Sequence, residues 1–272
     1  MAVLLLAGAL TWTGPWRVSA QDNAADGNPN AVINEARRDA ASGQLDSAIA
    51  NYERALTLIN GPSKAYDPII RFNLAMLHAA KGIDAFQANN LEDAIASFRS
   101  SLSWNPYSRD IRYNLSQAMY IQASRLMEQG TPATELTSIY KEILVEAARV
   151  READPANPNI LSILGYTHRN LGEEEAAAGV FAEKARVPFE VQEVRMDVGA
   201  SATKLSGVVK NLKLKAGDPV RLRFTMLALN GSAMATSDVE VAAPAVDENA
   251  AFEISIKTTQ DVAGWRYGIL AP

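Results

Sequence analysis

The first long stretch of the chain has apolar residues at helical spacing. From about Ala31 to Arg186 they recur every three or four positions, and short Gly, Asn and Pro breaks interrupt them. Two of the breaks are Asn105-Pro106 and the segment from Asp154 to Pro158. Proline cannot continue a helix but is tolerated in its first turn, so each break ends one helix and begins the next. The pattern predicts a helical domain over residues 31–187.

After Pro188 the apolar spacing changes to every second residue. Val220, Leu222 and Phe224 alternate with more polar neighbours, and Asn230-Gly231 follows them. Alternation is typical of strands with one buried face. Asn-Gly is the strongest short hairpin signal because both residues tolerate positive φ. Residues 188–272 are therefore predicted to form a small antiparallel β-sandwich, which gives a two-domain α + β chain.

The helical part repeats itself. The segment Arg71-Phe72-Asn73-Leu74 recurs as Arg112-Tyr113-Asn114-Leu115. In the second helix of a unit, a small residue stands four before an aromatic, as in Ala48 and Tyr52 or Ala94 and Phe98. That spacing places both side chains on one helix face, where the small residue lets a partner helix approach. Recurrence of such a unit predicts a solenoid of helical hairpins.

This unit resembles the tetratricopeptide repeat (TPR) family over about residues 31–186. The resemblance implies about four repeats, with the first helices lining a concave face that binds protein partners. Two departures are visible: the middle units exceed the usual 34 residues or so, and Leu136 stands where a small residue is expected. The residues at the family's positions are Ala48, Tyr52, Ala55, Ala94, Phe98, Pro106, Leu161, Leu164, Gly165, His168, Ala177 and Phe181.

The β part resembles the FxLYD family of small exported domains. The resemblance is carried by the segment from Gly207 to Asn211, then Phe224, Asn230-Gly231 and Phe252. The aromatic-Asp signature of that family is replaced by Leu229-Asn230. Trp265 and Tyr267 alternate onto one side of a last strand, which places them in the expected core of the sheets.

The N-terminal segment predicts export. Ala2–Leu10 is apolar, and small residues at Val18 and Ala20 match a signal-peptide cleavage site after Ala20. Residues 1–20 are thus expected to be a signal peptide and residues 21–30 a flexible leader. The usual basic residue before the apolar run is missing, so an uncleaved anchor is the alternative. No other segment approaches the ~18 apolar residues of a bilayer span, which predicts a soluble periplasmic or extracellular protein without an integral membrane span.

Charge and cysteine content exclude several classes of partner and chemistry. The formal net charge is −5 and neither part is basic, which disfavours nucleic acid and strongly anionic membranes. With no cysteine in the chain there are no disulfides, thiolate metal sites or cysteine nucleophiles.

No enzymatic motif appears. The two histidines, His78 and His168, stand in different repeats, and there is no phosphate loop, nucleophile elbow or zinc-binding pattern. The acidic run Glu173–Glu175 falls at the start of a predicted helix, where carboxylates stabilise the positive end of the helix dipole. The sequence predicts a non-enzymatic protein with no cofactor and no metal.

The candidate binding residues lie on the predicted first helices. Asn73 and Asn114 are expected at equivalent heights on adjacent helices, beside Arg71 and Arg112. Amides and guanidinium groups in such a row suit the backbone or a carboxylate of an extended peptide. The alternative is that they merely solvate the helix edge. His78 and Trp104 are further candidates on this face.

Two functional interpretations follow. The first is an exported adaptor or scaffold that binds a protein or peptide on the concave face of the TPR-like array. The second is a structural component of a cell-envelope complex, or a homo-oligomer that self-associates through the β domain. Fold analogy alone does not decide between them.

Overall fold

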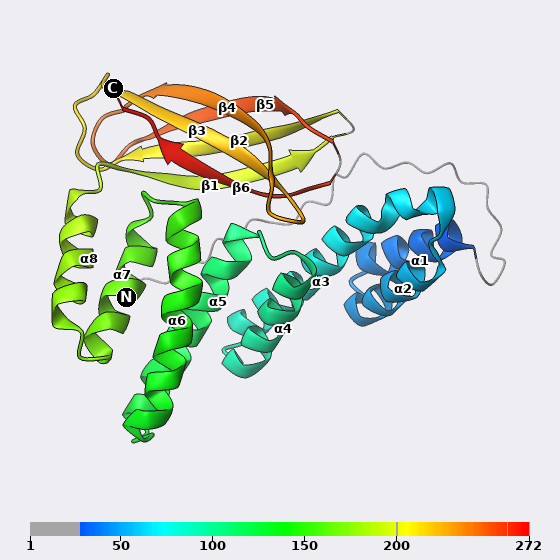
Figure 1. Ribbon diagram of the computed structural model, residues 1–272, viewed down its shortest axis with the longest axis horizontal. Helices are drawn as coiled ribbons and strands as arrows, with labels where there is room; N and C mark the ends of the chain where they lie inside the picture. Colours follow the sequence, from blue (N-terminus) through cyan, green and yellow to red (C-terminus); the bar gives the residue numbers. More distant parts are fainter. Residues whose placement is uncertain (1–27, 200, 260, 272) are drawn as a thin grey trace.

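The computed structural model describes residues 28–199, 201–259 and 261–271. The predicted signal peptide, its cleavage position Ala20 and residues 21–27 of the leader lie outside these ranges. Within them the N-terminal part is helical (Figure 1). The helices are α1 (Pro29–Ala41), α2 (Leu45–Leu58), α3 (Asp67–Gln87), α4 (Leu91–Trp104), α5 (Arg109–Glu128), α6 (Ala133–Ala153), α7 (Pro158–Asn170) and α8 (Glu174–Arg186), with a 3-10 helix, η1 (Gly61–Tyr66), before α3.

Consecutive helices pack as pairs, α1 with α2 through α7 with α8, and the pairs stand side by side (Figure 1). Local sequence sets their ends. Asn157 accepts hydrogen bonds from the backbone N–H groups of Asn159 (3.0 Å) and Ile160 (3.1 Å), and Pro158 fills the first helical position. Helices α3 and α5, with 21 and 20 residues, account for the long middle repeats.

Two helix pairs are held at very close range by a glycine facing an aromatic ring. A Cβ built on Gly82 of α3 would lie 2.5 Å from two ring carbons of Phe98 on α4. A Cβ on Gly165 of α7 would lie 2.6 Å from the ring of Phe181 on α8. Only a residue without a side chain lets the helix backbone lie against the ring at this distance.

The C-terminal part consists of two three-stranded antiparallel sheets. One has the strand order β1-β2-β5 and the other β4-β3-β6. At Glu193, where φ is +53°, β1 carries an irregularity that shifts its register with β2. The strands are β1 (Phe189–Val198), β2 (Ala202–Asn211), β3 (Pro219–Ala228), β4 (Ala233–Ala242), β5 (Asn249–Lys257) and β6 (Val262–Ile269).

The two sheets pack through aromatic rings. The fully buried ring of Phe224 on β3 lies 5.4 Å from Phe252 of the other sheet, measured between centroids. On its own sheet it lies 6.0 Å from Trp265 and 5.6 Å from Tyr267. Both of these β6 residues are buried, which confirms the prediction that they lie on the core side of a strand.

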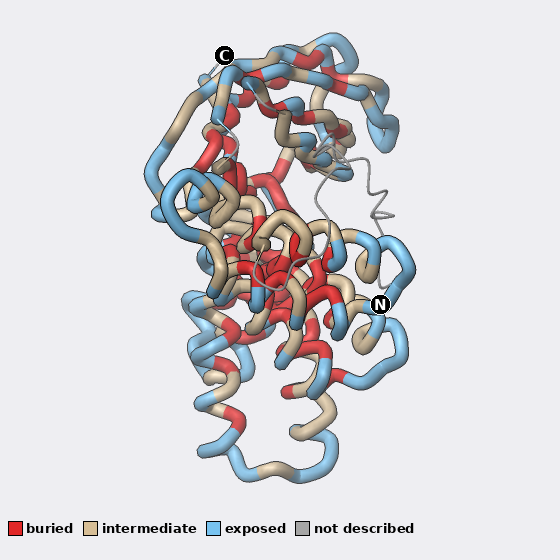
Figure 2. The backbone as a smooth tube through the Cα atoms, turned by 90° about the vertical axis from the view of Figure 1, so that its right-hand side faces the viewer, coloured by how far each residue is buried: buried red, intermediate tan, exposed pale blue. Residues whose placement is uncertain are grey.

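The apolar core crosses from the sheets into the helices. One continuous buried cluster contains Phe224 and Trp265 of the β part together with Ile160 of α7 and Phe98 of α4. Figure 2 shows buried backbone on both sides of the contact between the two parts. A second, separate cluster holds α1, α2 and the first half of α3 together.

Among the described helices, none is both long enough and apolar enough to cross a membrane.

Candidate functional site

Arg71 and Trp104 form a half-buried pair between α3 and α4. The Arg71 guanidinium lies 5.6 Å from the centroid of the Trp104 ring. Its Nε donates to Asp67 Oδ2 at 2.7 Å, one helical turn earlier. The side chain of Arg71 is still 40% exposed, so its outer N–H groups remain accessible to a ligand.

Asn73 faces the neighbouring helix α2. Its amide Nδ2 donates to the hydroxyl of Tyr52 at 3.1 Å. Tyr52 is fully buried, and burial raises the pKa of its hydroxyl to about 12, although the nearby Arg37 acts in the opposite direction. Asn73 therefore satisfies a buried hydroxyl and joins α3 to α2.

His78 also lies at the contact between α3 and α2. Burial lowers its pKa below the usual value; Lys81 acts in the same direction, while Glu53 and Asp46 oppose it. Beside it, Lys81 Nζ bonds Asp46 Oδ1 of α2 at 2.5 Å. The neutral imidazole is thus favoured at physiological pH.

Arg112 is placed differently from the sequence-based expectation. It is only 7% exposed; its guanidinium pairs with Glu146 of α6 and donates to the carbonyl of Pro106 at 2.5 Å. Asn114, on the same helix, is half-buried and makes no side-chain hydrogen bond within the described ranges. The burial of Arg112 corrects the expectation of an exposed row of two arginines and two asparagines.

The structure instead brings together a group of aromatic and polar residues on α5, α6 and α7, which we call the tyrosine patch. Tyr166 of α7 is 40% exposed, and its ring meets that of Phe181 edge to face at 5.1 Å. The guanidinium of Arg169 lies over both rings, 5.6 Å from Tyr166 and 5.1 Å from Phe181. The patch consists of Tyr120, Tyr140, Tyr166, Arg169 and Asn170.

Asn170 lies near two tyrosines of the patch. Burial raises the pKa of Tyr120 and of Tyr140; polar neighbours oppose the rise, Ser124 and Asn170 at Tyr120 and Asn170 at Tyr140. The Tyr140 ring is buried, whereas Tyr120 is half-buried and Asn170 is exposed. The patch therefore offers aromatic surface, a guanidinium and an amide next to one another.

A buried polar cluster, which we call the junction hub, fixes the β part to the helices. Asp154 at the end of α6 is buried and pairs with Arg109 of α5. It also accepts hydrogen bonds from the Tyr267 hydroxyl of β6 at 2.6 Å and from Asn157 Nδ2 at 2.9 Å. The hub thus joins α5 and the α6–α7 link to one strand.

The ionisable groups of the junction hub change one another's pKa values. Burial lowers the pKa of Arg109, but Asp154 and Asp110 more than offset this, so the net pKa is raised and the guanidinium stays charged. Burial raises the pKa of Tyr267, and the charge of Asp154 adds to the effect. Arg109 also lies 5.8 Å from the Trp265 ring centroid.

The link between α4 and α5 also contacts the β part. Asn105 Nδ2 donates to the carbonyl of Ala263 on β6 at 2.6 Å. Tyr107 packs so closely on Gly264 of β6 and on Gly231 of the β3–β4 turn that neither position has room for a Cβ. The β part therefore docks on the ends of α5, α6 and α7 (Figure 1). Tyr166 and Asn170 stay exposed.

Glu190 on β1 is expected to make the stability of the protein depend on pH. Burial raises its pKa above 4.5, and Asp154 adds to the rise, while Gln192, Lys210 and Arg109 oppose it. The unfolded chain then loses this proton at lower pH than the folded protein, so the free energy of unfolding falls as pH rises from about 4.5 through the folded pKa.

Glu190→Gln is therefore expected to stabilise the protein at pH 7 and to have little effect near pH 4. Urea unfolding at both pH values measures the difference. The exposed Glu253, paired with Lys204 at 2.9 Å, provides the control Glu253→Gln, for which no pH-dependent gain is expected. A Glu190→Gln protein that is no more stable than the parent at pH 7 would contradict the prediction.

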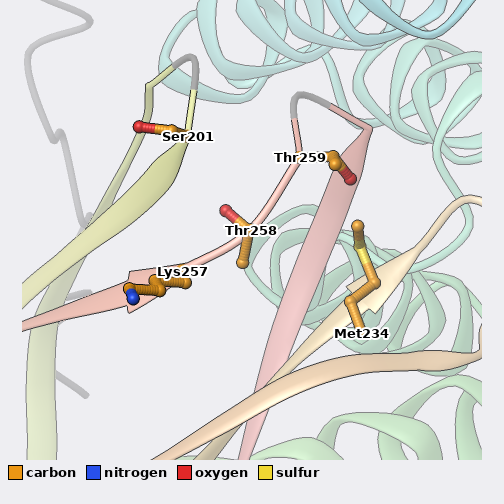
Figure 3. Close-up of a pocket in the computed structure, with 5 residues that line it drawn as sticks. All are labelled: Ser201, Met234, Lys257, Thr258 and Thr259. Atoms are coloured by element: carbon orange, nitrogen blue, oxygen red, sulfur yellow. The ribbon is translucent and has the colours of Figure 1, made fainter.

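An open pocket of about 460 Å³ lies at one end of the β part (Figure 3). Ser201, Thr258 and Thr259 supply hydroxyls, and Lys257 and Met234 complete its lining. Thr258 Oγ1 is already bonded to Thr203 Oγ1 at 2.6 Å. Positions 200 and 260, next in sequence to the lining residues Ser201 and Thr259, lie outside the described residues, and we assign the pocket no ligand.

Within the described residues, no group of three or more His, Asp or Glu side chains could hold a metal ion. His168 Nδ1 lies 2.6 Å from Glu173 Oε2, which places the second histidine in a local helix-end contact.

The tyrosine patch and the junction hub were not predicted from the sequence. The sequence pattern indicates only a link between helices from Asp154 to Pro158; the structure adds that Asp154 and Asn157 are buried there, and buried polar groups need partners. Tyr166 and Arg169 carried a weaker signal, their spacing of three residues on one helix face.

No protein-family model matches the chain, and no curated protein matches it. Similar solved structures include MamA MSR-1, with 14% identity and a TM-score of 0.33 over 61% of this chain and 80% of that one. Another is a thermophilic TPR protein in Thermus thermophilus, with 16% identity and a TM-score of 0.33 over 59% of this chain and 74% of that one. Likeness at this level says nothing about function, which has to be inferred from the geometry of this chain.

Proposed function

We propose that this protein is an exported, non-enzymatic scaffold that binds a protein or peptide partner on the face formed by α5 and α7. In this proposal the helix pairs form a TPR-like solenoid. The two sheets form a sandwich that holds the ends of α5, α6 and α7 in place. The observation that carries the proposal is the tyrosine patch, in which Tyr166, Arg169 and Asn170 stay exposed although the β part is docked nearby.

The composition of the patch supports protein binding. Tyr and Arg are among the residue types most enriched at the positions that dominate binding energy at interfaces. Arg169 is held over two rings, so part of its conformational entropy is already lost before a partner binds. Asn170 presents an amide that can pair with a peptide backbone.

The residues predicted from the sequence contribute in part. Arg71 and Trp104 remain half-exposed and extend the candidate surface toward α3 and α4. Asn73 and Arg112 hold neighbouring helices together through Tyr52 and Glu146. We therefore assign them a structural role and move the centre of the proposed site to the tyrosine patch.

Tyr166→Ala and Arg169→Ala are expected to weaken partner binding by about tenfold or more each, the scale of an interface hot spot. The full chain would be immobilised, partners captured from a cell-envelope extract, and the dissociation constant measured for each captured protein. Matched controls are Arg149→Ala and Val145→Ala on α6, both exposed and outside the patch, which should leave binding unchanged.

The alternative, assembly through the β part, makes a different prediction. Ile269 on β6 and Val246 are exposed apolar residues there. Concentration-dependent self-association that Ile269→Ala abolishes, with partner capture insensitive to Tyr166→Ala, would overturn the scaffold proposal in favour of this one.

A further inference from the structure

The chain contains two Asn-Gly sequences, Asn60-Gly61 and Asn230-Gly231, and their surroundings in the structure differ. Asn-Gly is the sequence most prone to spontaneous deamidation because glycine leaves its own backbone nitrogen unhindered. In that reaction the nitrogen of the glycine attacks the side-chain carbonyl carbon of the asparagine. The freedom of this nitrogen therefore decides which of the two sites reacts.

At Asn230-Gly231 the attacking nitrogen is held. Gly231 N–H donates to the carbonyl of Ala228 at 2.8 Å, and Ala228 N–H donates to the carbonyl of Ser232 at 3.0 Å, which closes the β3–β4 turn. The Asn230 side-chain oxygen accepts from Ser232 N–H at 2.9 Å. Tyr107 packs on Gly231 from the helical part. Reaction here requires these contacts to open first.

At Asn60-Gly61 the attacking nitrogen is free. Both residues are exposed, and Gly61 N–H has no hydrogen-bond acceptor among the described residues. The Asn60 amide Nδ2 donates to the carbonyl of Leu58 at 3.3 Å, and Asn60 stands as the N-cap of η1 in a capping box with Ser63. A Cβ at Gly61 would meet nothing within 4 Å, so no neighbouring group shields the site.

We propose that Asn60 is a spontaneous modification site of this protein, deamidating through a succinimide while Asn230 is protected. Gly61 N loses its proton to solvent base and bonds to Cγ of Asn60, and the side-chain amide leaves as ammonia. Water then opens the ring at either carbonyl and yields Asp or isoaspartate. In balance, one water is consumed and one ammonium ion is released, so the chain gains one negative charge.

The isoaspartyl product changes the link between α2 and α3. In the parent, Asn60 N–H donates to Ser63 Oγ at 2.8 Å, and Ser63 N–H donates to the Asn60 carbonyl at 3.0 Å. Isoaspartate adds a methylene to the main chain at this point, which displaces both partners. Aspartate keeps the backbone length and retains the contacts.

The test compares the two sites within one molecule. The full chain would be incubated at mildly alkaline pH, with and without urea, and peptide mapping by mass spectrometry would follow Asp and isoaspartate at both positions. We expect Asn60 to react about tenfold or more faster than Asn230 in the folded protein, the factor given by a barrier difference of about 1.4 kcal/mol. In urea the two rates should converge.

Equal rates in the folded protein, or faster reaction at Asn230, would overturn the proposal. Asn60→Asp provides the charge change without the isoaspartyl linkage and should migrate with the Asp product on ion exchange. Gly61→Ser should slow reaction at position 60 without affecting position 230.

Discussion

Asp154→Ala is expected to lower the free energy of unfolding by about 3–5 kcal/mol, the range found when one partner of a buried ion pair is removed. The carboxylate is buried, and its loss leaves Arg109 charged without its main counter-ion. Tyr267 and Asn157 lose their acceptor at the same time. Urea unfolding monitored by tryptophan fluorescence measures the change, with Trp265 beside the hub as a reporter.

The matched control is the exposed pair of Arg223 and Asp238, whose atoms are 2.7 Å apart on neighbouring strands. Surface pairs contribute little because water screens them, so Asp238→Ala should leave stability unchanged. Arg109→Ala combined with Asp154→Ala should cost less than the sum of the two single changes, since the pair is removed together. Additive costs would contradict the role given to the hub.

The hub also predicts that the two parts unfold together. Asp154 and Asn105 belong to links between helices, yet their side chains bond Tyr267 and Ala263 of β6. Those links were visible in the sequence as proline-ended breaks, but their partners stand more than a hundred positions further along the chain. A pattern of neighbouring residues does not reveal contacts between positions this far apart in the sequence. The hub could therefore not be predicted from it.

The error at Arg112 has a specific geometric cause. The expected row paired Arg71 with Arg112, because the segments around them are alike. If Phe98 is aligned with Tyr140 instead, Arg112 corresponds to Ile70 and not to Arg71. The first alignment was therefore shifted by one residue. One residue turns a side chain by about 100° around a helix. Ile70 is fully buried, and Arg112 shares that inward position with its charge neutralised by Glu146.

A better signal for the repeat was present in the sequence. In each helix pair a small residue of the first helix precedes the aromatic of the second helix by the same distance. The contacts of Gly82 and Gly165 show the physical reason, since the ring lies against the helix backbone. This spacing crosses a turn and is therefore easier to overlook than a pattern within one helix. The pairs are Ala36 and Tyr52, Gly82 and Phe98, Ser124 and Tyr140, and Gly165 and Phe181.

Gly82→Ala is accordingly expected to destabilise the protein by about 2 kcal/mol. Alanine favours a helix over glycine by up to about 1 kcal/mol. Against this, the new Cβ would lie 2.5 Å from two ring carbons of Phe98, which is 1% exposed and has no room to retreat. Overpacking of this kind costs about 1–3 kcal/mol, and we expect the upper end because the ring is enclosed.

Gly179→Ala in α8 is the control that separates the two effects. A Cβ there meets nothing within 4 Å, so only the helix preference acts and the variant should gain up to about 1 kcal/mol. Thermal and urea unfolding of both variants measure the opposite signs. Phe98→Leu combined with Gly82→Ala should recover part of the loss of Gly82→Ala if the ring is the obstacle. A stabilising Gly82→Ala would show that the ring of Phe98 can move aside and does not set the distance between α3 and α4.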